Sequence, residues 1–289
     1  MSSRLSSARP ALLHGAVYLA FAALLFYVFA PYLWLIFTAL STQANLQLRF
    51  PAQPTLANII EAFTGQTLRW TRNSFIIASS TTLLALAASV TGGYALSRGT
   101  FRGKATLMYG IILTRVIPST LIIVPVFGMM LWLGLLDTHL GLVLVYVGIT
   151  TPFNLWIMKG AIDAVPVELE EAAQLDGASR LKILGTVVLP LIVPGIGAVG
   201  VLSFDAAWGG FIMPLVLLSS TDKYPVSVGM FTAFGLDENV DFPKLATMCL
   251  IYMLPGDHPL LHGRRLLPQG PGLDRRRRPL MATGGGGRH

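Results

Sequence analysis

Long apolar runs alternate with short polar segments along most of the chain. A helix needs about 17 to 25 apolar residues to cross a bilayer. Five runs meet that length, at residues 12–40, 73–96, 105–135, 141–158 and 190–218. A sixth begins near Lys244. The pattern predicts an all-α, polytopic membrane bundle with six intended transmembrane helices.

Prolines interrupt two of these runs. Pro118 and Pro125 lie within the third run, which is long enough to tilt or break, and Pro194 and Pro214 lie within the glycine-rich fifth run. Broken helices are tolerated at membrane depth where the backbone faces protein or a water-filled cavity. We therefore interpret the fifth run as a helix that lines a pathway.

The sixth run departs from the others. Its apolar part, residues 245–254, is about half the length of a span, and Gly256-Asp257-His258-Pro259 is expected to end it. The remainder, 255–289, is an atypical tail rich in Arg, Gly and Pro. We favour a frameshifted or mispredicted C-terminus, and the alternative is a basic cytoplasmic tail that contacts anionic lipid.

Composition supports a membrane protein and excludes several other classes. The chain is 53% hydrophobic and 12% charged. Its net charge of +7 comes mainly from arginines after Gly256, so the basicity belongs to the tail and does not indicate nucleic-acid binding. The single Cys249 excludes a disulfide framework. We find no metal site, no cofactor site and no phosphate-binding loop, so energy for any transport must come from a partner.

Charge distribution predicts the orientation. Arg4 and Arg9 precede the first run, which places residues 1–11 in the cytoplasm by the positive-inside rule. Residues 12–254 then form one transmembrane domain, whose polar segment 160–189 returns to the cytoplasm. Polar outer loops are expected at 41–72 and 221–243.

One acid-rich segment lies between the fourth and fifth runs. Pro166 suits the first turn of a helix, where the acidic residues that follow it complement the helix dipole. Gly177 can adopt a positive φ and end that helix. Ser179 can cap a second helix from Arg180 to about Val188. The segment therefore predicts a helix, a sharp turn and a second helix that leads into the membrane.

This segment also carries a spaced motif. It reads Glu171-Ala172-Ala173, three residues, Gly177, nine residues, Val187, one residue and Leu189-Pro190. The spacing resembles the EAA loop of ABC importer permeases, although Val187 stands where that family usually has isoleucine. Residues 166–173 further resemble the carbohydrate branch, in particular the maltose-type second permease. The likeness covers about residues 14–254.

The resemblance implies a function and a set of partners. In that family the first helix of the loop docks on a cytoplasmic ATPase subunit, which implies docking by Glu170, Glu171, Ala172, Ala173, Asp176 and Gly177. It further implies a second permease, two copies of the ATPase, an extracytoplasmic solute-binding protein and a sugar cargo. The location implied is the inner membrane of a bacterial or archaeal cell, with no covalent chemistry in this chain.

Several polar and aromatic residues in the predicted spans are candidates for the substrate pathway. Arg115 and Asp205 are ionisable groups inside membrane segments, where charge is costly and usually faces a cavity or a partner. Sugars need hydrogen-bonding groups beside flat apolar surfaces. The full candidate set is Arg115, Asn154, Ser203, Asp205, Trp208 and Phe211.

Two other classes of function stay open at this stage. An ion-coupled secondary transporter would need coupling charges in the membrane and often an internal repeat, and the sequence shows no convincing repeat. A non-transporting membrane scaffold would use the acidic segment only to hold a soluble partner.

Overall fold

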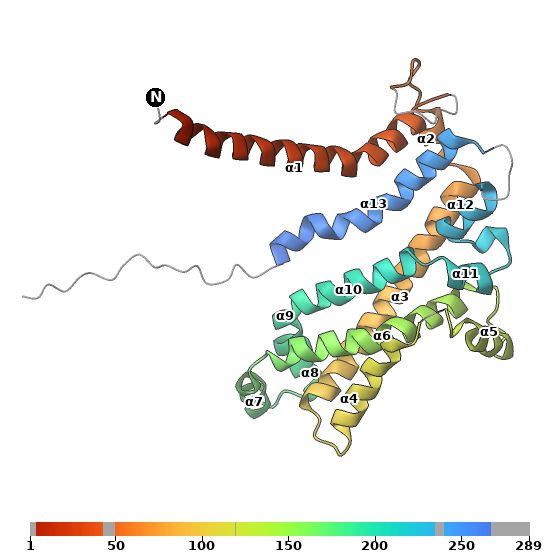
Figure 1. The fold of residues 1–289 in the computed structure, drawn as a ribbon. Coiled ribbons are helices and arrows are strands. Elements are labelled where there is room, and N and C mark those ends of the chain that lie inside the picture. The colour runs from red at the N-terminus through yellow and green to blue at the C-terminus, as the bar shows by residue number, and fades with distance from the viewer. Residues whose placement is uncertain (1–3, 43–49, 119, 235–239, 267–289) are drawn as a thin grey trace, which may run out of the picture.

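The computed structural model describes residues 4–42, 50–118, 120–234 and 240–266. These residues form helices and connecting turns (Figure 1). The helices that match the first, second and fourth apolar runs are unbroken, and each is long and apolar enough to cross a membrane. They are α1 (Arg4–Ala39), α3 (Gly65–Arg98) and α6 (His139–Asp163).

The second span begins earlier than the hydrophobic pattern predicts. Helix α3 starts at Gly65, so residues 65–72, expected in an outer loop, are helical. Trp70 and Asn73 are buried within this first part of α3, where Asn73 donates hydrogen bonds to the carbonyls of Asp222 and Tyr224. Tertiary contacts to the far end of the chain thus extend the helix beyond its apolar core. A short helix, α2 (Ala57–Ala62), precedes it.

The third run is broken, one of the two outcomes that its prolines allowed. It forms α4 (Lys104–Leu113), a 3₁₀ turn η1 (Thr114–Val116) and α5 (Ile123–Trp132). The break falls just before Pro118, as expected from the clash of a proline ring with a preceding helical backbone. Within the described residues of this run, only Met130 is fully buried, so the run lies on the surface of the bundle.

The fifth run breaks where its prolines permit it. The chain continues through Pro190 as α8 (Arg180–Ile183), a π-helical turn η2 (Leu184–Val188) and α9 (Leu189–Leu191). It then bends by 84° into α10 (Val193–Trp208). Pro194 occupies the first turn of α10, where its missing N–H costs little. Pro214 lies in a separate short helix, α11 (Ile212–Leu217).

The predicted outer loop 221–243 contains a packed helix, which corrects the expectation of a polar loop. After η3 (Thr221–Lys223), helix α12 (Val226–Phe234) buries Val226 and Val228 completely against the bundle. Residues 226–229 are all buried, so this part of the helix is enclosed by the bundle, although the segment is too short to be noticed as a membrane run.

The expected end of the sixth helix at Gly256 is wrong. Helix α13 runs from Phe242 to Leu266 and passes through Pro255 and Pro259, because an interior proline removes a hydrogen bond and bends a helix but does not always end it. Its apolar part, Phe242–Pro255, is nevertheless shorter than a span. The rest of the predicted tail, 267–289, lies outside the described residues.

The bundle centres on α3, which packs along α6 and α10, whereas α1 lies apart and approaches α13 (Figure 1). Helix α7 (Val167–Leu175) lies at one end of the bundle, and α2, α5, α11 and α12 lie at the other. Two main apolar cores follow the bundle. One joins α6 to α10 and α11, and the second fastens the segment after α7 to α6.

Candidate functional site: the loop helix and its anchor

Helix α7 has the ends that its sequence predicts. Pro166 precedes the first residue, and Glu168 and Glu170 lie in the first turn, near the positive end of the helix dipole. At the other end Gly177 has a φ of +82°. The Ala178 N–H donates to the Ala173 carbonyl at 3.0 Å, and the Gly177 N–H donates to the carbonyl of Gln174 at 3.0 Å. This pair of bonds is the Schellman motif, which ends the helix sharply.

The second helix of the segment fastens the loop to the bundle. The Ser179 hydroxyl accepts a hydrogen bond from the Lys182 N–H and caps α8 as predicted. Ile183 and Val188 are buried in the core that includes Met158 and Ile162 of α6. This shared core packs the segment after α7 against α6.

Glu170 faces the bundle, which differs from the docking role that the resemblance implies for it. Its side chain is only 9% exposed, and it pairs with Arg98, the last residue of α3. The Arg98 Nε lies 2.8 Å from one carboxylate oxygen, and the Tyr94 hydroxyl donates to the other at 2.8 Å. Four-residue spacing places Tyr94 and Arg98 on one face of α3, but nothing in the sequence identifies their partner.

Arg98 also holds the end of α6. Its second terminal nitrogen donates to the carbonyls of Ile162 at 3.1 Å and Val165 at 2.8 Å, which lie at the C-terminal end of that helix. One guanidinium thereby joins the ends of α3 and α6 to α7. We call Tyr94, Arg98 and Glu170 the anchor.

The other predicted docking residues lie on the outer side of α7. Glu171, Ala172, Asp176 and Gly177 are exposed and Ala173 is half-buried. Two large apolar side chains accompany them, since Leu175 is 90% exposed and Leu181 is 80% exposed. A cavity of about 510 Å³ lies between this segment and the end of α3. Apolar side chains this exposed beside carboxylates are typical of an interaction surface.

Two predicted pathway residues form a buried pair instead of lining a cavity. The Asn154 side chain donates to the Ser203 hydroxyl at 2.8 Å, and the hydroxyl donates in turn to the Val199 carbonyl. Asn154 is 1% exposed and Ser203 is completely buried. The pair therefore joins α6 to α10.

The two aromatic candidates also pack inside the bundle. Trp208 is buried, stacks between Phe204 and Tyr252, and donates its indole N–H to the Tyr252 carbonyl at 2.9 Å. Phe211 is half-buried and meets Phe231 of α12 edge to face. The Trp208 ring is therefore occupied on both faces, and the Phe211 ring is partly exposed.

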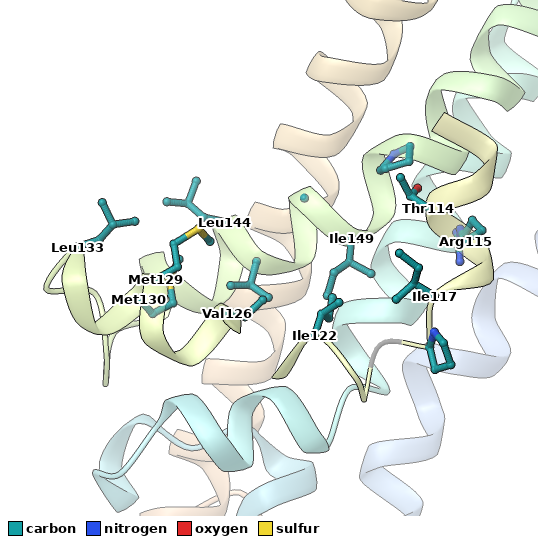
Figure 2. A pocket seen from close by; sticks show the side chains of 14 residues that line it. Thr114, Arg115, Ile117, Ile122, Val126, Met129, Met130, Leu133, Leu144 and Ile149 are labelled. Atoms are coloured by element: carbon teal, nitrogen blue, oxygen red, sulfur yellow. The ribbon is translucent and has the colours of Figure 1, made fainter. Parts of the chain in front are cut away.

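The two ionisable candidates do not meet. Asp205 is exposed on α10, and no ion pair joins it to Arg115 in the described part of the chain. Arg115 lies over the ring of Phe153 and lines a cavity of about 740 Å³ between α5 and α6 (Figure 2). Of the six pathway candidates, Arg115 is the one that lines a cavity described here.

A polar cluster at the opposite end of the bundle was not predicted from the sequence. Asp137 accepts hydrogen bonds from the N–H groups of Ser219 and Ser220, each at 3.0 Å, and pairs with Lys223 at 2.8 Å. Burial raises the pKa of the Asp137 carboxyl, but the bonds from Lys223 and Ser220 outweigh it and hold the pKa well below its usual range. The cluster ties the turn before α6 to η3. Among the described residues no group of His, Cys, Asp or Glu could hold a metal ion.

The part of the chain that contains the loop matches a known protein family. Residues 86–255 match the family described as binding-protein-dependent transport system inner membrane component. The match spans the anchor and the loop and ends at Pro255.

Individual relatives agree with this match. The chain is 37% identical over 206 residues to an ABC transporter permease protein of Streptomyces antibioticus, which covers 71% of this chain and 90% of the relative. It is 35% identical to the sulfoquinovosyl glycerol transport system permease protein of Agrobacterium fabrum, over 69% of this chain and 72% of the relative. It is 29% identical to the trehalose/maltose transport system permease protein of Thermococcus litoralis, over 84% and 88%.

The fold has a counterpart among solved structures. A bacterial ABC transporter involved in import of the acidic polysaccharide alginate contains a chain with a TM-score of 0.75, at 23% identity, over 89% of this chain and 96% of that one. The helical bundle, the loop with its predicted ends and the match over residues 86–255 agree. This multi-pass membrane chain belongs to the family of binding-protein-dependent transport system inner membrane components, a family of transport permeases and not of enzymes.

Proposed function

We propose that this chain imports a sugar or oligosaccharide as one permease of an ATP-driven complex with an ATPase, a second permease and an extracytoplasmic binding protein. The relatives support the cargo class, since several are named as permeases for sulfoquinovosyl glycerol, maltodextrin, galactooligosaccharides or trehalose and maltose. Two copies of the ATPase would serve the two permeases. The loop end and the N-terminus would face the cytoplasm.

The anchor is the observation that carries this proposal. A docking helix must pass its movement to the membrane spans, and Arg98 bonds α7 to the ends of α3 and α6 at once. The exposed side of α7, with Glu171, Asp176 and Leu175, is then available for the ATPase. When the ATPase closes on ATP, α7 moves as a lever, and the spans attached to it alternate the access of a central cavity.

The family match also bears on the two other classes of function. A permease of a binding-protein-dependent system draws on ATP through a partner, whereas an ion-coupled transporter would need a relay of membrane charges. Arg115 and Asp205 form no such relay in the part of the chain described. A pure scaffold would not need its docking helix bonded to two spans.

Co-purification with the ATPase encoded nearby tests the docking surface. Leu175→Asp places a charge at the most exposed apolar position of α7 and should abolish retention of the ATPase. The matched control is Leu56→Asp, at an exposed leucine before α2 at the other end of the bundle, which should retain it. ATP-dependent sugar uptake by the reconstituted complex should follow the same order. Equal retention by both variants would contradict the docking assignment.

A further inference from the structure

Arg115 is an exposed cation in the third apolar run. It lies in η1, at the break of the third apolar run. Its guanidinium carbon is 4.5 Å from the centre of the Phe153 ring, a cation–π contact, and the ion pairs between described residues all involve other side chains. Membrane cations normally face a counter-charge or water. Arg115 is exposed, so it is open to a ligand, and an anion that pairs with it would come from outside the described part of this chain.

The side chain borders two cavities. The larger, about 740 Å³, is within the size range of small-molecule sites, which is roughly 300 to 1,000 Å³. Thr114 and Arg115 lie at one end of it, and Leu133 and Leu144 lie at the other (Figure 2). The second cavity, about 370 Å³, is lined by Arg115 together with Ile112, Phe153 and Trp156.

The helix opposite Arg115 leaves room and an acceptor for a polar ligand. Gly148 and Pro152 of α6 both line the larger cavity. A β-carbon built on Gly148 would meet no atom within 4 Å, so the space before it is open. Because Pro152 has no N–H, it cannot donate the helical hydrogen bond to the carbonyl of Gly148. That carbonyl is an acceptor for a hydroxyl group.

Two aromatic rings lie beside Arg115 in the smaller cavity. Trp156 is 49% exposed and shares the smaller cavity with the ring of Phe153. Flat rings beside polar groups suit the apolar C–H faces of a saccharide. A guanidinium suits a planar carboxylate or a sulfonate, because its parallel N–H groups bind two oxygens at once.

We propose that Arg115 makes this permease selective for saccharides that carry a carboxylate or a sulfonate. The inference rests on the proposed function, because it names the cargo class of the same transport route. The anion pairs with Arg115 at the break of the third run as the cargo crosses, while hydroxyl groups reach Thr114 and the carbonyl of Gly148. A neutral sugar of equal size would leave the guanidinium without a counter-charge.

Uptake by the complete importer in proteoliposomes, with its ATPase, second permease and binding protein, tests the selectivity. The probes are glucose, glucuronate and the 6-sulfonate of 6-deoxyglucose, together with the corresponding disaccharides, so that neutral and anionic cargo differ at one carbon. Arg115→Gln should lower uptake of the anionic probes by about tenfold or more, since a hydrogen bond to a charged group contributes about 1.5 to 3 kcal/mol. Arg115→Lys should retain part of that uptake, and any neutral uptake should change less than about twofold.

Two controls and three outcomes make the test decisive. Arg72→Gln removes an exposed arginine of α3 outside the cavities and should leave uptake unchanged. Hydrolysis of ATP stimulated by the binding protein reports assembly of each variant. Uptake of neutral saccharides alone, or equal loss of neutral and anionic uptake in Arg115→Gln, as expected if Arg115 only binds a lipid headgroup, overturns the inference and leaves the proposed function intact. Failure of the assembled importer to move any saccharide with ATP overturns the proposed function itself.

Discussion

Arg98 and Glu170 lie 72 residues apart in sequence, and their side chains meet at 2.8 Å where α3 ends against α7. Both are largely buried, at 19% and 9% exposed. A buried ion pair whose remaining hydrogen bonds are satisfied specifies a position more than it adds stability. The pair therefore fixes where α7 lies relative to α3 and α6.

Removing Arg98 should lower the stability of the protein and weaken the link between ATP hydrolysis and transport. Arg98→Ala leaves the Glu170 carboxylate buried without its partner, which costs about 3 to 5 kcal/mol in comparable pairs. The double variant Arg98→Met with Glu170→Leu removes both charges and should recover most of the unfolding temperature. Thermal unfolding in detergent, followed by tryptophan fluorescence, measures this difference.

The ratio of transport to ATP hydrolysis separates the role of the anchor in transport from its role in folding. In the double variant, which should be stable, the ATPase should still bind through the exposed side of α7, but the amount of sugar transported per ATP hydrolysed should fall severalfold. Normal transport at normal protein levels in the double variant would show that the anchor is structural only.

The close approach of α12 to α3 predicts that a larger side chain at Gly229 destabilises the protein. A β-carbon on Gly229 would lie 2.3 Å from the Trp70 ring, which is itself fixed by a 2.8 Å hydrogen bond to the Thr221 carbonyl. Gly229→Ala should therefore destabilise the protein by about 1 to 3 kcal/mol through overpacking. Gly160→Ala is the control, because its β-carbon meets nothing within 4 Å in α6 and alanine favours a helix. Equal unfolding temperatures for the two variants would contradict this contact.

The loop was predictable from the sequence because its structure is local. Proline at the start, glycine at the end and serine before the next helix each act on their own backbone, and the structure has all three in place. The anchor was not predictable, since it depends on which helix ends come together. Arg98 reads in sequence as one cation of a basic loop, and its partners Ile162 and Glu170 lie 64 and 72 residues away.

The same distinction explains the pathway candidates. Residue type indicated that Asn154, Ser203 and Trp208 need hydrogen bonds, but not that Asn154 bonds to Ser203 and Trp208 to the Tyr252 carbonyl inside the bundle. The burial of α12 was missed for a related reason, because its contact with Trp70 is made by segments at opposite ends of the chain. Local rules locate helix ends, and long-range packing decides which polar groups are left for a ligand.

The hydrogen bond between Asn154 and Ser203 predicts a change in stability without a change in selectivity. Asn154→Leu removes the hydrogen bond that the buried Ser203 hydroxyl accepts, while this hydroxyl keeps its bond to the Val199 carbonyl, and should cost about 0.5 to 1.5 kcal/mol. Uptake per folded molecule should be unchanged, because neither residue reaches a cavity described here. Fluorescence unfolding and uptake normalised to protein amount measure the two quantities. Altered cargo preference in this variant would return Asn154 to the pathway.

Asp137 predicts a pH dependence of stability at the end of the bundle opposite α7. Its folded pKa lies well below the ordinary value of about 3.9 for an unfolded aspartate. A depressed folded pKa adds stability above the unfolded pKa, and this stability is lost as pH falls through the interval between the two values. Asp137 has a positive φ of 53°, which asparagine also tolerates, so Asp137→Asn removes the charge without straining the backbone.

Comparing the two proteins from pH 7 to pH 3 isolates this carboxylate. At pH 7 the Asp137→Asn variant should unfold at a lower temperature, because Lys223 loses its partner while Ser219 and Ser220 can keep an acceptor. Below about pH 4 the unfolded chain takes up a proton at Asp137 while the folded carboxylate stays charged, so the advantage of the native protein should shrink and the gap between the two unfolding temperatures should narrow. A gap that stays constant down to pH 3 would mean that the carboxylate charge does not stabilise this turn.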